Sequence, residues 1–364
     1  MQIIEEVYKT EYFSSPIYDR YFEDRSMVVF DIETMGLDAK KAPVILAAFL
    51  ELSKEGNKDG NKDGNRDANK DGNAVFRQFF IEDYSEEEKL IEMIIDELEK
   101  FDVILTYNGK FFDLPYISSR NIFYGNGSYV PSGYSLDLYQ VIHRASDIRK
   151  ITGSLSQKSI EKYMGIDHLR DDEISGGESV TLFGEYLNSA DISKKKELGR
   201  YILLHNHDDV MQLYRLLPII RQTDFHKAMY KLGFPVDGIG LWPDLTVNSI
   251  KVGKDSFEVS GTVSEHSNQT KKVYYSFETD EQPFESSFDS DGSFVIKYGC
   301  ETLKGSTFID LSNKLSDEKI EFLSTFSVLV GKYIVLKEGR EICFSAANLT
   351  AKLLLQQLME TIEY

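Results

Sequence analysis

The chain has 364 residues and a hydrophobic content of 41%, which is enough to build folded cores and excludes global disorder. This length is comfortable for two domains. The chain contains no long apolar run that would predict a transmembrane helix, and its charged N-terminus lacks the pattern of a secretory signal. The two cysteines form no CxxC pair, so we expect neither a disulfide framework nor a thiolate zinc site and predict a cytoplasmic protein.

The net charge of −19, taken alone, argues against a nucleic-acid partner, because phosphate binding usually appears as clustered Lys and Arg. A site made of carboxylates is nevertheless acidic by construction, and its metal ions then supply the positive charge. The acidic composition therefore does not exclude a metal-dependent enzyme that acts on phosphates.

Apolar and β-branched segments in the first part of the chain predict strands. They lie at 27–31, 43–52, 74–81 and 102–107. Helical patterns include an apolar stripe at 90–98 that follows a predicted capping box at 85–88, and two further segments at 111–121 and 198–217. Because strands come first and then alternate with helices, the order predicts an α/β fold with a mixed sheet flanked by helices.

The residue pattern of the sequence changes after about residue 222. Segments that alternate in the strand period lie at 246–252, 256–263, 272–278, 293–299 and 328–336, and a helical pattern closes the chain at 347–362. We therefore predict a first domain over residues 1–222 and a smaller β-rich domain of unknown role, with a terminal helix, over residues 223–364. Within the first domain, the Asn-Lys-Asp-Gly repeats of residues 55–73 predict a long loop at a hairpin tip.

Two carboxylates follow the first apolar strand, in the order Asp31-Ile32-Glu33. Residues i and i+2 of a strand point to the same side, so Asp31 and Glu33 can aim at one point where the sheet ends. Two carboxylates at one point repel unless a hard cation joins them, and oxygen ligands suit Mg²⁺ or Mn²⁺. Thr34 and Gly36 follow and could let the backbone approach a substrate.

A second acidic position follows the strand DVILTY. The Asn108-Gly109 pair permits a tight turn at the end of this strand, after which Asp113 comes near the start of a helix. Asp113 could cap this helix or bind a metal, and the pattern alone favours neither. Phe112 could stack on a base, although an aromatic residue at helical spacing is more often part of a core.

The third position lies in a helical segment with the order His205-Asn206-His207-Asp208-Asp209. His205 and Asp209 are four residues apart and therefore share one face of a helix. A lone His on such a helix is more often structural, but its pairing with Asp209 favours a role at a site.

Together these segments resemble the three exonuclease motifs of the DEDD superfamily, and most closely the RNase H-like domain of the YprB type. The resemblance spans roughly residues 25–220. Its motifs are Asp31-Ile32-Glu33-Thr34, Tyr107-Asn108-Gly109 through Asp113-Leu114-Pro115, and His205-Asn206-x-x-Asp209.

The resemblance implies a 3′→5′ exonuclease with two divalent cations, Mg²⁺ or Mn²⁺. It places them on four carboxylates, those of Asp31, Glu33, Asp113 and Asp209. It also implies a side chain that orients or deprotonates the attacking water, four residues before the last Asp, where this chain has His205 instead of the Tyr of one branch. His207 and Tyr201 lie at less suitable spacings for this role.

Two alternatives to the exonuclease stay open. A catalytically weak or inactive module that binds nucleic acid or protein would keep the fold without the chemistry, and a structure-selective endonuclease would use the same carboxylates. The sequence does not distinguish a DNA 3′ end from an RNA 3′ end as the substrate, and it identifies no protein partner. No membrane association is expected.

Overall fold

The computed structural model describes residues 1–54, 71–172, 174, 176–264, 273–279, 282–289 and 291–361. These residues form two compact units, Met1–Gln222 and Thr223–Tyr364. The predicted loop over 55–73 lies mostly outside the described residues, which resume at residue 71.

A mixed sheet of six strands organises the described part of the first unit, in the spatial order β1-β4-β3-β2-β5-β6. Its strands are β1 (Gln2–Glu11), β2 (Met27–Thr34), β3 (Val44–Lys54), β4 (Asp71–Phe80), β5 (Val103–Thr106) and β6 (Tyr134–Asp137). The β1, β4, β3 and β2 strands pair antiparallel, whereas β2, β5 and β6 run parallel. The carboxyl ends of these three parallel strands therefore meet at one edge of the sheet.

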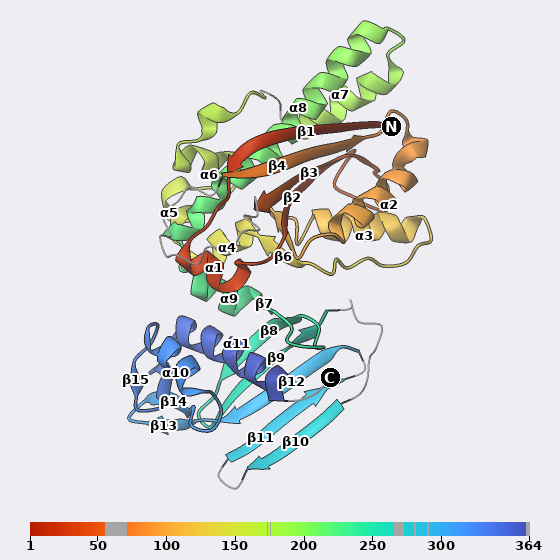
Figure 1. Cartoon of the computed structure of the whole chain (residues 1–364). Helices are drawn as coiled ribbons and strands as arrows, with labels where there is room; N and C mark the ends of the chain where they lie inside the picture. Colours follow the sequence, from red (N-terminus) through yellow and green to blue (C-terminus); the bar gives the residue numbers. More distant parts are fainter. Residues whose placement is uncertain are drawn as a thin grey trace. The chain divides into compact units, whose positions relative to one another are not determined.

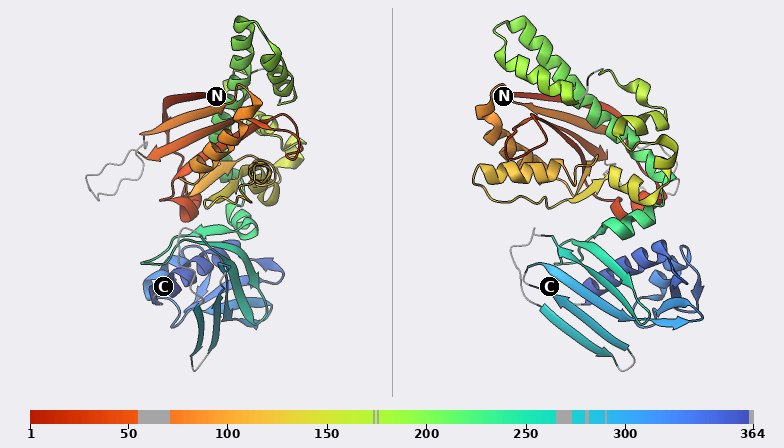
Figure 2. Two further views of the ribbon diagram at one scale, coloured as in Figure 1. Left: turned by 90° about the vertical axis from the view of Figure 1, so that its right-hand side faces the viewer. Right: turned by 180° about the vertical axis from the view of Figure 1, so that it is seen from behind.

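Helices cover both faces of this sheet (Figures 1 and 2). Two successive residues of β4 show this, since Arg77 pairs at 2.9 Å with Glu97 of α2 (Glu87–Leu98), while the Gln78 amide donates at 2.9 Å to the Leu203 carbonyl of α8 (Ile192–Leu216). Alternation along a strand places these two side chains on opposite faces, so α2 and α8 lie on opposite sides. The remaining helices are α1 (Pro16–Phe22), α3 (Asp113–Phe123), α4 (Leu138–Ala145), α5 (Ile148–Thr152), α6 (Gln157–Met164) and α7 (Gly176–Asn188), with 3-10 turns η1 (Tyr84–Glu86), η2 (Asp167–Leu169) and η3 (Leu217–Gln222).

A buried ion pair links α2 and α3 on one side of the sheet. The Arg120 guanidinium on α3 donates from Nε to Glu87 Oε1 at 2.7 Å and from Nη2 to Oε2 at 2.5 Å. The same carboxylate accepts the backbone N–H of Val44 at 2.8 Å and the hydroxyl of Tyr124 at 2.7 Å. One carboxylate thus joins β3, α2 and α3, which keeps its charge satisfied inside the protein.

The predicted capping box at residues 85–88 is wrong. The Asp83 carboxylate accepts from the Ser85 N–H at 2.9 Å and caps the 3-10 turn η1 instead. The α2 helix then begins at Glu87, directly after this turn, and the side chain before it makes no capping hydrogen bond. A short 3-10 turn ahead of an α-helix displaces the cap by a few residues, which the spacing of Ser and Glu does not reveal.

The second unit is β-rich. Its first sheet has the strand order β10-β11-β12-β9-β8-β7, and its second has the order β13-β14-β16-β15, with β17 paired to β16. The strands are β7 (Phe234–Val236), β8 (Leu245–Val252), β9 (Ser256–Val263), β10 (Val273–Thr279), β11 (Gln282–Phe288), β12 (Ser293–Gly299), β13 (Glu301–Leu303), β14 (Ser306–Asp310), β15 (Leu329–Val330), β16 (Tyr333–Glu338) and β17 (Glu341–Ile342); the helices are α9 (Phe225–Leu232), α10 (Asp317–Ser324) and α11 (Phe344–Thr361). The fold confirms the predicted mixed α/β sheet, the β-rich C-terminal part and the terminal helix.

One strand predicted in this unit is wrong. Residues 328–336 form a hairpin instead of a single strand, since Val330 pairs with Tyr333 in the β15–β16 ladder. Gly331 between them has a φ of 64°, a left-handed conformation that glycine adopts without steric penalty. The alternating pattern continues across the turn and conceals it.

Candidate metal centre

The carboxyl ends of the parallel strands gather the predicted acidic residues. Asp31 and Glu33 lie near the end of β2, at alternate positions and hence on one face. Between them, the backbone N–H of Ile32 donates to Asp113 Oδ1 at 3.2 Å, which brings the first residue of α3 to the same edge. Glu33 and Asp113 are buried, and Asp31 is partly buried.

Helix α8 supplies the remaining groups from the face that packs on the sheet. Asn206 donates from Nδ2 to Asp31 Oδ2 at 2.8 Å. The His205 Nε2 atom lies 3.5 Å from Glu33 Oε1 and 3.6 Å from Asp209 Oδ2. The four predicted carboxylates and His205 therefore converge from β2, α3 and α8, which are far apart in the sequence.

A constrained turn places Asp113. Asn108 has a φ of 65°, and Gly109 is packed so closely that an added Cβ would lie 2.5 Å from the Cβ of Thr106. The Asp137 carboxylate at the end of β6 accepts the backbone N–H groups of Asn108 at 2.9 Å and Lys110 at 3.3 Å, and it also caps α4. The predicted tight turn is thus present, and Asp137 acts on it as a structural anchor.

Burial sets the electrostatics of the carboxylates. It is the largest cause that raises the pKa of Glu33 to about 7, with Asp209 acting in the same direction and the facing His205 ring opposing it. Burial also raises the pKa of Asp113 to about 7, against the hydrogen bond from the Ile32 backbone. Burial and then the neighbouring carboxylates hold the pKa of Asp31 well above its usual range. Protons or cations must therefore compensate this cluster at neutral pH.

The α8 side of the cluster carries a cation that the sequence did not reveal. The Arg170 guanidinium lies 2.6 Å from Asp209 Oδ1 and 2.8 Å from Asp172 Oδ1. Asp172 in turn contacts the Nδ1 atom of His205. Burial lowers the pKa of His205, but the hydrogen bond with Asp172 and the facing carboxylates outweigh it and raise this pKa overall. Arg170 and Asp172 come from a charged loop without periodicity, so no pattern pointed to them.

The predicted substrate-contacting residues have mixed surroundings. The Thr34 hydroxyl is engaged with the Gly36 carbonyl at 2.9 Å, and this carbonyl also accepts the Tyr116 hydroxyl at 2.9 Å. Phe112 is partly buried and packs against the core, with its ring centroid 5.3 Å from that of Tyr116. The neighbouring Phe111 is 61% exposed.

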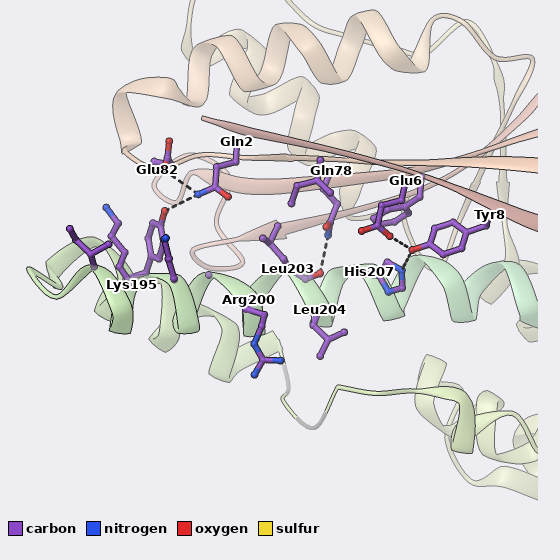
Figure 3. A pocket seen from close by; sticks show the side chains of 16 residues that line it. Gln2, Glu6, Tyr8, Gln78, Glu82, Lys195, Arg200, Leu203, Leu204 and His207 are labelled. Carbon is purple, nitrogen blue, oxygen red and sulfur yellow. Dashed lines mark hydrogen bonds between the residues drawn. The ribbon is translucent and has the colours of Figure 1, made fainter.

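A groove of about 600 Å³ lies along another side of α8 (Figure 3). Four residues of α8 at four-residue spacing line this groove: Lys195, Gly199, Leu203 and His207. His205 and Asp209 lie two residues further along from Leu203 and His207, and therefore on a different side of the helix. The opposite wall comes from β1 and β4 and includes Tyr8, whose hydroxyl lies 3.1 Å from His207 Nε2. His207 thus faces this groove and is not part of the carboxylate cluster.

The residues at the sheet edge fit a divalent cation. Ligand atoms of Glu33, His205 and Asp209 lie within 4.8 Å of one another, and this group does not include Asp31 or Asp113, which adjoin it through hydrogen bonds from Asn206 and Ile32. Carboxylate oxygens suit Mg²⁺ and Mn²⁺, so with these ions the carboxylates would be the ligands and the His205 imidazole would stay free.

The first unit is an α/β domain with a buried acidic cluster at the carboxyl ends of its parallel strands. Residues 28–220 match the RNase_H_2 family of the RNase H superfamily, and the chain belongs to this superfamily. The match confirms the predicted RNase H-like domain at the level of the superfamily.

Two DNA polymerases are similar to parts of this chain. A DNA polymerase of Methanocaldococcus jannaschii is 32% identical over 110 residues, which covers 25% of this chain and 6% of the polymerase. The solved structure of the family B DNA polymerase from the hyperthermophilic archaeon Pyrobaculum calidifontis matches with 22% identity and a TM-score of 0.38, covering 57% of this chain and 26% of that chain. The chain therefore spans only a small part of either polymerase. Within the described residues, each helix is too short or too polar to cross a bilayer.

Proposed function

We propose that the first unit is a metal-dependent nuclease of the DEDD type that removes nucleotides from the 3′ end of single-stranded nucleic acid. The observation that carries this proposal is the convergence of four carboxylates, from β2, α3 and α8, at one edge of the sheet. Membership of the RNase H superfamily supports it. The finer assignment to the YprB type rests on the spacing of the three motifs.

In this proposal Asp31, Glu33, Asp113 and Asp209 hold the divalent cations. Two such ions, bound across a phosphodiester, would activate a water and stabilise the leaving 3′ oxygen. The four carboxylates are brought close despite their mutual repulsion, which a purely structural cluster would have no reason to maintain. Cations would also offset the net charge of −19 where a phosphate approaches.

We assign the proton acceptor to His205. Its Nε2 atom faces the space between Glu33 and Asp209, within a few ångströms of both carboxylates. A water in that space would lie within hydrogen-bonding reach of the ring, which is the geometric requirement for a general base. Tyr201 is exposed and His207 lines the groove on another side of α8, so both suit this role less well.

The test uses the full chain with 5′-labelled single-stranded DNA and RNA, in Mg²⁺, in Mn²⁺ and in chelator. We expect products that shorten progressively from the 3′ end, only with metal. Asp31→Asn and Asp209→Asn should abolish the products, whereas Asp96→Asn, which removes an exposed carboxylate on α2, should leave the rate unchanged. Products that persist in both Asp31→Asn and Asp209→Asn would refute the assignment of the site.

Circular single-stranded DNA separates the alternatives. An exonuclease leaves the circle intact, whereas linearised circles would indicate an endonuclease on the same carboxylates. Metal-dependent binding of the linear strand without any cleavage would indicate a binding module.

A further inference from the structure

We propose that Asp172 is a positioning residue that holds the proton of His205 on Nδ1 and thereby presents the Nε2 lone pair to the space between Glu33 and Asp209. This inference rests on the proposed nuclease function, because it assigns the group that prepares the proton acceptor. It concerns a residue outside the predicted motifs and outside the four carboxylates.

The contact between the two side chains fixes the orientation of the ring. His205 Nδ1 lies 2.5 Å from Asp172 Oδ2, and both side chains are almost completely buried, at 4% and 1% exposure. An ionised carboxylate only accepts hydrogen bonds, so the ring nitrogen that faces it must carry a proton. In a neutral ring, Nε2 then has no proton and presents its lone pair to the opposite side.

The ring can act as a base only while Nε2 carries no proton. Nε2 faces the space beside Glu33 at 3.5 Å and Asp209 at 3.6 Å, the two carboxylates assigned above to the cations. A ring protonated on Nε2 cannot accept a proton from a water between these groups. The buried contact with Asp172 therefore holds the single proton of the neutral ring on Nδ1.

Asp172 is itself held on both sides. Its Oδ1 atom accepts from Arg170 Nη1 at 2.8 Å, while Oδ2 contacts His205 and lies 3.7 Å from the Lys158 ammonium. The Arg170 fork is in turn fixed on Glu161, with Nε at 3.0 Å from Oε2 and Nη2 at 2.7 Å from Oε1. A bidentate pair of this kind sets direction as well as distance, so the carboxylate of Asp172 has little freedom to rotate.

The backbone beneath Asp172 is tied to the same helix that carries His205. Asp208 Oδ2 on α8 accepts the N–H groups of Asp171 at 2.6 Å and Asp172 at 2.8 Å. Its other oxygen lies 3.1 Å from His207 Nδ1, and the far nitrogen of that ring meets Tyr8 in the groove, as Figure 3 shows. The loop and the helix therefore hold both partners of the His205–Asp172 contact in register.

The decisive measurement is ¹⁵N NMR of the histidine rings in the metal-free full chain, at a pH that leaves His205 neutral. Protonated and unprotonated ring nitrogens resonate far apart, so the tautomer is read directly, and His205→Gln assigns the signal. We expect the Nδ1–H tautomer in the wild type and a shift towards Nε2–H in Asp172→Asn. Asp171→Asn, which neutralises the exposed neighbouring carboxylate, should match the wild type.

An Nε2–H tautomer in the wild type, or an unchanged tautomer in Asp172→Asn, would overturn the proposal without any need for an activity. In the nuclease assay, Asp172→Asn should lower kcat by about 10²–10⁴-fold with little change in KM, because the ring keeps its place but offers the wrong nitrogen. A wild-type protein without nuclease activity would refute the proposed function alone, since the NMR result stands separately. Full activity in Asp172→Asn would refute the positioning role.

Discussion

Binding of a metal ion at this site should be coupled to the release of protons from its carboxyl groups. Glu33 and Asp113 have pKa values raised to about 7, chiefly by burial. A carboxylate must lose its proton before it can hold a cation, so binding of Mg²⁺ or Mn²⁺ should strengthen as the pH rises from 6 to 8. The perturbation is therefore a change of pH at constant ionic strength, applied to the metal-free protein.

The size of this effect follows from the two pKa values. A group with a pKa of about 7 is roughly 9% ionised at pH 6 and roughly 91% ionised at pH 8, a change of about 10-fold. Two such groups give a gain of about 100-fold in apparent affinity across this range. The same arithmetic predicts that these two carboxyls alone release about 1.8 protons at pH 6 and about 0.2 at pH 8, and the raised pKa of Asp31 adds to this release.

Isothermal titration calorimetry in buffers of different ionisation enthalpy measures both quantities. Glu33→Gln should remove about one of the protons released at pH 6, while the exposed Asp96→Asn should change nothing. Affinity that stays constant from pH 6 to pH 8, or binding without proton release at pH 6, would show that these carboxyls do not hold the ion.

The same pKa shifts set the sign of a stability change in the metal-free protein. Both carboxyls titrate near 4 when unfolded and near 7 when folded, so the folded state binds more protons between these values. Their contribution to stability is complete below pH 4 and is lost as the pH rises through 7. A saturating metal ion should counteract this loss, which thermal unfolding with and without chelator would show.

Three further substitutions test parts of the scaffold. Arg120→Met leaves Glu87 buried without its partner and should lower the free energy of unfolding by about 3–5 kcal/mol in urea titrations, and a double variant with Glu87→Gln that is no more stable would contradict this reasoning. Asp137→Ala removes the acceptor for the turn before α3; we expect a loss of about 1–3 kcal/mol and slower cleavage, and an unchanged Tm and rate would argue against an anchoring role. Gly109→Ala drives a Cβ against Thr106 and should destabilise by about 1–3 kcal/mol, whereas a fully stable Gly109→Ala protein would mean that this turn has room to move.

The acidic cluster could be predicted because the spacing of its residues along a strand and along a helix determines which side chains share a face. Alternation along β2 puts Asp31 and Glu33 on one face, and the four-residue spacing on α8 does the same for His205 and Asp209. The edge where they meet follows from the parallel direction of β2, β5 and β6, which the alternation of strands and helices implied.

Other features left no periodic trace. The β1 strand pairs along its full length with β4, yet it was not predicted, because apolar residues such as Ile3 and Ile4 fall on both of its faces and give no alternation. Arg170 and Asp172 lie in a charged loop, and only the packing of that loop against α8 brings them to His205. Contacts of this kind depend on tertiary structure and not on spacing in the sequence.

The distribution of charge across the cluster indicates where cations are needed. On the α8 side, Arg170 already contacts Asp209 and Asp172, so part of the negative charge is neutralised by the protein itself. On the β2 side, the contacts of Asp31 and Asp113 described above are hydrogen bonds from neutral groups, the Asn206 amide and the Ile32 backbone. Hydrogen bonds from neutral donors stabilise a carboxylate less than a cation does. We therefore expect Asp31 and Asp113 to depend most on a divalent ion for charge compensation, whereas Asp209, whose pKa is also raised by burial, is already partly neutralised by Arg170.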